Sequence, residues 1–409
     1  MPSDIHSPRL ESRRLVAFGL GLLLIFLLPA YAASQVTAGN WSFAHYDNER
    51  TGFNPDEVVL SPSNVDKLVE RWSFAACGGA VDPPVVANGV AYLVADCKAG
   101  GNTFIFTLFA ISAATGKLLW QSPLGVSHAN CEASFPPAVS GDVVYAGSCY
   151  GVTAIDARTG ARLWQNTGLG PVVSNPLYAN GAAVDNGMLY FTAANGNVYA
   201  LYTSNGLLDW NFASPYGIAG APAVAGGFAY VSAVNGVVYA LVAEIGAVLW
   251  TSARTPSYEV GGSPSVGNGM VYVSGLFGGI TALDTNTGAV LWNNLGSVNV
   301  EGTPSLAYGL AYIAVEDEDN GPRTAYALNA ETGNIVWQVP NIGSWFAVAI
   351  ANGVVYAVND GDKKIYALNA MTGGVLATFG NGNVNSTPVV VNGTVYFTGF
   401  DGALYAYGI

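Results

Sequence analysis

The stretch from Ala282 to Trp292, Ala-Leu-Asp-Thr-Asn-Thr-Gly-Ala-Val-Leu-Trp, decides the fold, because most of the chain repeats it. Ala282 ends one expected strand, and the carboxylate of Asp284 can accept hydrogen bonds from the amides of the following turn. Gly288 supplies the positive φ that such a turn requires, and the residues up to Trp292 open the next strand. The phrase therefore predicts a β-hairpin that leads to an aromatic anchor.

The same layout recurs along the chain in six full copies and two partial ones. One partial copy has Ala377 where the tryptophan is expected, and the other reaches Ala406 just before the last residue. A strand with a tyrosine precedes each copy, and in the clearest cases an Asn-Gly turn, the strongest short hairpin signal, comes before that strand. The full copies cover residues 110–120, 154–164, 200–210, 240–250, 282–292 and 327–337.

These phrases define eight units of about 40 to 50 residues, each with the signals of four short strands. Such a period is typical of the blades of a β-propeller. The sequence therefore predicts an all-β, eight-bladed β-propeller.

The phrase Ala-x-Asp-x-x-Thr-Gly-x-x-x-Trp, as at Ala154, Asp156, Thr159, Gly160 and Trp164, resembles the tryptophan-docking motif of the pyrroloquinoline quinone (PQQ)-like propeller repeats. The resemblance covers nearly all of the chain after its first residues. It places this chain in the quinoprotein alcohol dehydrogenase-like superfamily, and it implies that each docking tryptophan packs against the next blade.

The composition is that of a turn-rich, weakly charged protein. The chain has 409 residues, of which 51% are hydrophobic, 10% are charged and 51 are glycines. The net charge of -13 argues against nucleic acid and anionic membrane surfaces as partners.

The first 32 residues are interpreted as a signal peptide. Three arginines up to Arg14 precede the apolar run from Leu15 to Leu28, and Ala30-Tyr31-Ala32 reads as a cleavage site. The apolar run is shorter than the roughly 20 residues of a spanning helix, although an uncleaved anchor stays an alternative. We therefore expect an exported protein, periplasmic or extracellular, with no membrane span in the mature chain.

The expected domain organisation has an irregular N-terminal segment at 33–66 and the propeller at 67–409. The last unit ends after its third strand, while the strand from Leu68 to Phe74 has no blade of its own. Pairing the two, so that residues 67–74 complete the last blade, closes the ring and removes an exposed sheet edge.

All four cysteines fall in the first two blades. We expect Cys77 to pair with Cys97 and Cys131 with Cys149, because each pair has one member before an innermost strand and one at the end of the second strand. Export and an even cysteine count favour disulfides, and the spacing does not match a zinc site.

The loops that lead into the innermost strands are expected to form a funnel-shaped face around the central channel. Counting back from the prolines and turns of these strands places Glu301, Trp345 and Asn385 near the mouth on neighbouring blades. Glu132 and Glu259, in two other blades, lie two positions further along the chain from the innermost strand. A few polar groups among small residues are typical of a small-ligand pocket, and these five residues are the candidates for cofactor binding.

The sequence offers no recognisable catalytic constellation and no metal site. The quinoprotein alcohol dehydrogenases that the repeat resembles carry a vicinal cysteine disulfide over their cofactor, and this chain has none. Since fold does not determine function, three hypotheses stay open. The first is a non-catalytic module that binds a small molecule or a protein at the funnel. The second is a reduced PQQ- and calcium-dependent alcohol or sugar dehydrogenase. The third is an outer-membrane assembly scaffold of the BamB type.

Overall fold

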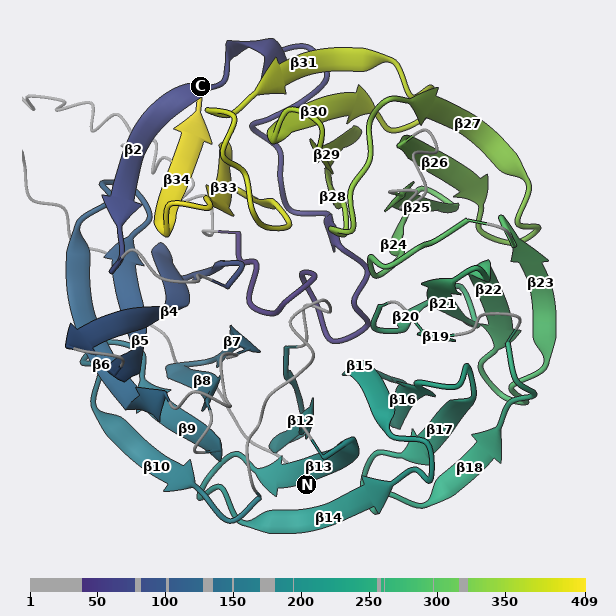
Figure 1. The fold of residues 1–409 in the computed structure, drawn as a ribbon, viewed down its shortest axis with the longest axis horizontal. Coiled ribbons are helices and arrows are strands. Elements are labelled where there is room, and N and C mark those ends of the chain that lie inside the picture. The colour runs from purple at the N-terminus through teal and green to yellow at the C-terminus, as the bar shows by residue number, and fades with distance from the viewer. Residues whose placement is uncertain are drawn as a thin grey trace, which may run out of the picture. The chain divides into compact units, whose positions relative to one another are not determined.

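The computed structural model describes residues 39–409 except 78–81, 101–102, 128–134, 149–150, 170–180, 194, 256–258, 261, 297 and 316–322. Eight antiparallel sheets surround a central axis in this part of the chain, as Figure 1 shows. The predicted eight-bladed propeller is therefore confirmed. Its helical content, among the described residues, is the 3-10 turn η1 (Val65–Lys67), and no helix there is long and apolar enough to cross a membrane.

Each blade is an up-and-down sheet whose first strand lies innermost and whose fourth lies at the rim. The first four blades comprise β3 (Val85–Ala87), β4 (Val90–Gly100), β5 (Thr103–Ser112) and β6 (Leu118–Ser127); β7 (Phe135–Ser140), β8 (Val143–Ser148), β9 (Gly151–Asp156) and β10 (Arg162–Asn166); β11 (Ala183–Asp185), β12 (Met188–Thr192), β13 (Asn197–Tyr202) and β14 (Leu208–Ala213); β15 (Ile218–Ala225), β16 (Phe228–Ala233), β17 (Val238–Val242) and β18 (Val248–Thr251).

The other four blades follow the same order, and two short strands are added to them. The short β19 (Glu259–Val260) pairs with blade 5, and β1 (Phe53–Asn54) runs parallel to the innermost strand of blade 7. The main strands are β20 (Ser265–Gly267), β21 (Met270–Leu276), β22 (Gly279–Asp284) and β23 (Val290–Asn294); β24 (Ser305–Ala307), β25 (Leu310–Val315), β26 (Thr324–Asn329) and β27 (Ile335–Pro340); β28 (Ala349–Ala351), β29 (Val354–Asn359), β30 (Lys364–Asn369) and β31 (Val375–Phe379); β32 (Val389–Val391), β33 (Thr394–Thr398), β34 (Ala403–Gly408) and β2 (Val69–Ala75).

The up-and-down order gives the ring two different faces. The connections between blades and the turns between second and third strands lie on one side, which we call the loop face. The turns between first and second strands and between third and fourth strands lie on the other side, the turn face. The loop face corresponds to the funnel expected from the sequence.

The ring closes through β2. This strand pairs antiparallel with β34, so that Trp72 lies opposite Ala406 in the last blade. The indole Nε1 of Trp72 donates a hydrogen bond to the carbonyl of Ala113 in blade 1, at 3.0 Å. The N-terminal strand therefore supplies both the rim of blade 8 and its contact with the next blade, as the sequence predicts.

The tryptophans of the repeat fasten each blade to its neighbour. Each indole donates from Nε1 to a carbonyl in the third-to-fourth-strand turn of the next blade, and its ring lies against that turn's glycine. The donor and acceptor pairs are Trp120 with Ala157, Trp164 with Thr203, Trp210 with Ala243, Trp250 with Thr285, Trp292 with Ala330 and Trp337 with Ala370, at 2.8 to 3.0 Å. The docking role that the resemblance implies is thus what the structure has.

Blade 5 allows this docking contact to be tested with a matched pair of glycines. Gly288 (φ +70°) and Gly269 (φ +75°) share the left-handed backbone conformation, but a Cβ on Gly288 would lie 2.4 Å from the Trp250 ring, whereas Gly269 has nothing within 4 Å. Gly269→Ala is expected to cost about 1–2 kcal/mol of unfolding free energy from backbone strain alone. Gly288→Ala should cost about 1–3 kcal/mol more, because the ring must also move. Denaturant unfolding of both variants measures the difference, and equal losses would show that the indole contact carries no stability.

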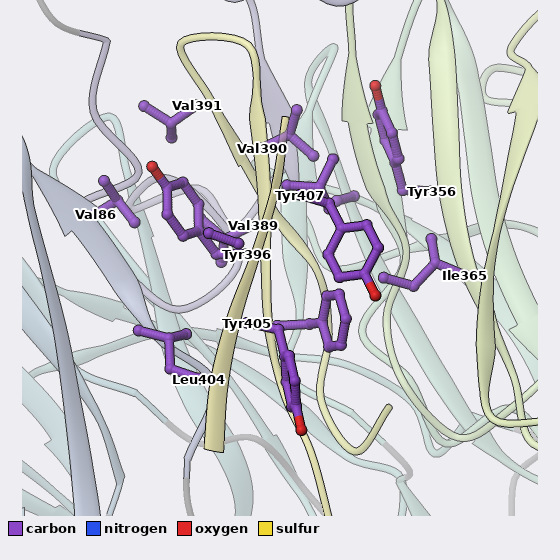
Figure 2. Close-up of a cluster of buried hydrophobic side chains, with 14 of the residues drawn as sticks. Val86, Tyr356, Ile365, Val389, Val390, Val391, Tyr396, Leu404, Tyr405 and Tyr407 are labelled. Carbon is purple, nitrogen blue, oxygen red and sulfur yellow. The ribbon is translucent and has the colours of Figure 1, made fainter. Parts of the chain in front are cut away.

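The hydrophobic core lies between the blades rather than at one centre. Figure 2 shows the part formed by blades 7, 8 and 1, where Tyr356, Val390, Tyr396 and Leu404 are buried. The alternation of the strands turns one set of side chains to each neighbouring blade, so that every blade shares its core with two others.

Candidate functional site

Residues 39–54, which we call the hub segment, occupy the central channel of the ring. In Figure 1 this stretch is the purple trace that winds inside the innermost strands. Those strands have an open inner edge, where unpaired amides need an acceptor. The hub segment satisfies this need at equivalent positions in seven successive blades. In blade 3 the acceptor is a side chain, since the Val184 amide donates to Oδ1 of Asn48 at 3.0 Å. In the other six blades an amide donates to a hub carbonyl at 2.7 to 2.9 Å: Val86 to Trp41, Val139 to Ser42, Val224 to Asn48, Val266 to Glu49, Leu306 to Thr51 and Ile350 to Gly52.

The eighth blade is reached through a side chain. The Asn54 amide nitrogen Nδ2 donates to the carbonyl of Val390 in β32 at 2.8 Å. At the other end of the segment, the Gly39 amide donates to Oδ1 of Asn392 at 3.0 Å. The hub segment therefore touches every blade, and it does so largely through backbone groups.

Arg50 lies at the centre of this arrangement and is 1% exposed. Its guanidinium donates to the carbonyls of Pro222 (2.8 Å), Ala44 (3.3 Å) and Gly181 (3.2 Å), which ties the hub segment to itself and to blades 3 and 4. Burial lowers the pKa of Arg50 to about 10. Each of its three guanidinium nitrogens thus donates to a backbone carbonyl of the protein itself.

Two further titratable groups of the hub segment, the buried His45 and the half-buried Asp47, are shifted toward their neutral forms. Burial lowers the pKa of His45 to about 3, with a smaller contribution from the Arg50 charge. The His45 Nε2 lies 3.3 Å from the carbonyl of Pro304 and 3.2 Å from Oγ of Ser305. Burial also raises the pKa of Asp47 to about 6, although its carboxylate accepts hydrogen bonds from Thr51.

A small cavity lies between the hub segment and the loop face. Its volume is about 20 Å³, and Trp41, Ala44 and His45 line it from the hub side. Residues at the start of the innermost strands form its walls: Pro83, Pro84, Thr303, Ala347, Thr387 and Val389. A cavity of this size holds about one water molecule, whereas small-molecule pockets typically measure about 300–1,000 Å³.

The residues predicted at the channel mouth lie outside this cavity wall. Glu301, Trp345 and Asn385 each precede by two positions a residue that lines it, namely Thr303, Ala347 and Thr387. Glu301 and Asn385 are half-buried, and Trp345 is exposed on the loop face. Their joint action as a cofactor site stays a prediction. Among the described residues, no three His, Cys, Asp or Glu side chains are grouped so that they could hold a metal ion.

Several other predicted residues fall outside the described part of the chain. Cys131, Glu132 and Cys149 are among them, and of Glu259 only the backbone is described, where it opens β19. The predicted disulfide between Cys77 and Cys97 is present, with Cα atoms 4.9 Å apart. Since Cys77 follows β2 and Cys97 lies in β4, this bond links the closing strand of blade 8 to blade 1.

A cluster that the sequence did not point to surrounds Lys363 on the loop face. Its ammonium lies 5.4 Å from the ring centroid of Trp345 and 5.1 Å from that of Phe400. Only Trp345 was among the predicted residues. Lys363 and Phe400 lie in turns between second and third strands, which have no fixed composition in the repeat, so that no sequence signal distinguishes them.

The chain is similar to known proteins that differ from one another in function. One stretch of 157 residues, 36% of this chain, is 29% identical to the 1-butanol dehydrogenase (cytochrome c) of Thauera butanivorans, of which it covers only 21%. BamB from Moraxella catarrhalis superposes with a TM-score of 0.65 at 18% identity, over 84% of this chain and 98% of that one. The quinohemoprotein alcohol dehydrogenase of Comamonas testosteroni gives a TM-score of 0.69 at 15% identity, over 90% and 80%. At these identities the two structures show the fold alone.

The family model with the description "outer membrane protein assembly factor BamB" matches residues 40–175, 150–266 and 256–409. These matches together span all eight blades and the hub segment except its first residue, Gly39. The chain therefore belongs to this family of PQQ-like repeat propellers.

Proposed function

We propose that this protein is an exported binding module without chemistry of its own, which engages its ligand or partner on the loop face. The observation that supports this most is the hub segment. It runs through the channel and bonds to the innermost strands of seven blades, and the cavity between it and the loop face has room for about one water molecule.

The described residues do not fit PQQ in the channel. A quinone dehydrogenase needs a metal held by several oxygens, a carboxylate base and flat walls on both sides of the cofactor ring. Glu301 is the one carboxylate at the predicted inner tier. If Glu301 is a metal ligand, the described residues of this tier offer no second carboxylate as base, since Glu132 and the Glu259 side chain are not described. The cavity-lining residue that follows Glu301 in sequence is Thr303.

The alternative with most support after this one is a scaffold in outer-membrane assembly, because the matching family model carries that description. It shares the absence of chemistry with our first proposal, and it commits to a protein partner in outer-membrane assembly. The match to part of a butanol dehydrogenase supports the dehydrogenase alternative, but it reaches only about a third of this chain.

Titration of the purified chain with PQQ and Ca²⁺ tests the proposal. We expect no saturable heat of binding at micromolar concentrations and no dye-linked oxidation of alcohols or sugars. Glu301→Gln should behave like the unchanged protein, as should the exposed control variant Glu331→Gln. Micromolar binding with turnover that is lost in Glu301→Gln but kept in Glu331→Gln would overturn the proposal.

A further inference from the structure

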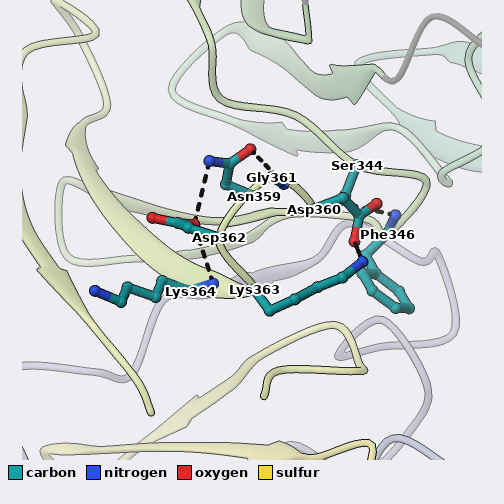
Figure 3. Close-up of polar contacts among 8 residues, drawn as sticks. All are labelled: Ser344, Phe346, Asn359, Asp360, Gly361, Asp362, Lys363 and Lys364. Atoms are coloured by element: carbon teal, nitrogen blue, oxygen red, sulfur yellow. Dashed lines mark hydrogen bonds and ion pairs between the residues drawn. The ribbon is translucent and has the colours of Figure 1, made fainter. Parts of the chain in front are cut away.

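A buried carboxylate holds the side chain of Lys363 in place. Its Nζ forms an ion pair of 2.7 Å with Oδ1 of Asp360, whose side chain is 1% exposed, as Figure 3 shows. Both residues lie in the turn between β29 and β30 of blade 7. The lysine side chain is therefore anchored rather than free to sample the solvent.

Two aromatic rings from different blades meet at this ammonium. Trp345 comes from the connection into blade 7 and is 39% exposed, and Phe400 comes from a turn of blade 8 and is 54% exposed. The distances from Nζ put their centroids no more than about 10.5 Å apart. Two exposed aromatic side chains close together form an apolar patch, and such patches, unlike single exposed residues, mark interaction sites.

The backbone fixes the three segments relative to one another. The Val384 amide donates to the carbonyl of Lys363 at 3.1 Å, and the Phe400 amide donates to the carbonyl of Asn383 at 3.0 Å. The Asn383 side chain is half-exposed, and its Nδ2 lies so close to Gly399 that a Cβ there would be 2.7 Å away. The turns that carry Lys363 and Phe400 are thus held to the Asn383 segment, and this order lowers the entropy cost of binding.

The chemistry of this surface selects for an uncharged ligand. The lysine charge is compensated by a buried carboxylate and by two ring faces, so it offers little attraction to an anion. A ligand can meet two exposed aromatic rings and the Asn383 amide, which a hydrogen bond with the Tyr405 side chain already orients. Saccharide rings match this combination, because they present an apolar C–H face and a rim of hydroxyl groups.

We propose that Trp345, Lys363, Asn383 and Phe400 form a binding site for a neutral saccharide, which we call the blade 7–8 site. The proposal deepens the proposed function, because it names the class of ligand that a non-catalytic loop face would bind. Trp345 and Phe400 stack on sugar rings, Asn383 bonds to hydroxyl groups, and Lys363 keeps the two aromatic rings in position.

The test is titration of the full chain with four neutral oligosaccharides: cellohexaose, maltohexaose, xylohexaose and chitohexaose. At least one is expected to bind with a change in tryptophan fluorescence. Trp345→Ala and Phe400→Ala should each lower that affinity about tenfold. Because the ligand is neutral, affinity should stay the same between about 50 and 500 mM salt. Phe277→Ala is the matched control, since Phe277 is 51% exposed in the equivalent turn of blade 5, and it should bind normally.

Three results would overturn the proposal. They are no binding by any of the four probes at millimolar concentration, binding that Trp345→Ala leaves unchanged, and binding of decaproline that is lost in Trp345→Ala while the saccharides fail. The last result would assign the surface to a polypeptide. Thermal melts of the variants exclude misfolding as the cause of a loss. The quinone titration is scored by Glu301→Gln, at a residue outside the blade 7–8 site, so the two tests fail independently.

Discussion

A chain that begins at Ser61 is expected to lose its cooperative unfolding transition, although it keeps the closing strand β2. It lacks the hub segment, and seven innermost strands then expose an amide that had a partner. At about 1 kcal/mol for each hydrogen bond and about 3 kcal/mol for the burial of Trp41, the loss is about 10 kcal/mol. This is comparable to the whole stability of a typical domain, about 5–15 kcal/mol. Differential scanning calorimetry measures it directly.

A chain that begins at Gly39 is the matched control, and its melting temperature should equal that of the longer chain. A synthetic peptide of residues 39–60 added to the shorter chain should restore part of the transition, because the contacts are made through backbone groups. A chain from Ser61 that melts at an unchanged temperature would show that the blades hold the ring without the hub segment.

The second large effect concerns the pH dependence of stability, which His45 and Asp47 are expected to influence in opposite directions. The folded-state pKa of His45, about 3, is below its usual 6.5, so the unfolded chain binds the proton more readily. This contribution is fully present above pH 6.5 and is lost as the pH falls toward 3, by about 5 kcal/mol in all. The pKa of Asp47, about 6, is above its usual 3.8, so its contribution falls by about 3 kcal/mol as the pH rises from about 4 to about 6.

Between pH 4 and 6 the two contributions therefore nearly cancel in the unchanged protein. His45→Gln should make stability fall with rising pH in this window relative to the unchanged protein, and Asp47→Asn should make it rise. Urea unfolding at half-unit pH intervals measures all three curves, and the other carboxylates contribute equally to each. Three parallel curves would contradict the shifted pKa values of His45 and Asp47.

The fold could be predicted from the sequence because its determinants are local and repeated. A docking tryptophan, a turn glycine such as Gly288 and an Asn-Gly pair each specify a short-range geometry, and eight repetitions fix the architecture. The pairing of β2 with the last blade could be predicted as well, because the sequence has one strand without a blade and one blade without its fourth strand. Cys77 and Cys97 were paired for a similar reason, namely their places relative to two strands of one repeat.

The hub segment could not be predicted in the same way. Residues 39–54 have no periodicity, and their contacts with the blades are made mainly by backbone groups, which any sequence supplies. The candidate site could be predicted only in part, for the same reason. Glu301, Trp345 and Asn385 were placed by counting from strand positions, which gives the right loops but cannot show that the channel beside them is filled. The link between Trp345 and Phe400 runs through Lys363, and it depends on the packing of two blades.

The hub segment also has a consequence for the order in which the molecule assembles. Asn54 bonds to Val390, 336 positions later, and Gly39 bonds to Asn392, 353 positions later. A chain that emerges N-terminus first presents these residues before any blade exists to receive them, and their last partners arrive only with the final blade. Contacts between such distant residues slow folding, and the open inner edges stay available for wrong pairing in the meantime. We therefore expect this protein to fold late, as a whole, and to depend on protection from aggregation until its last strands have emerged.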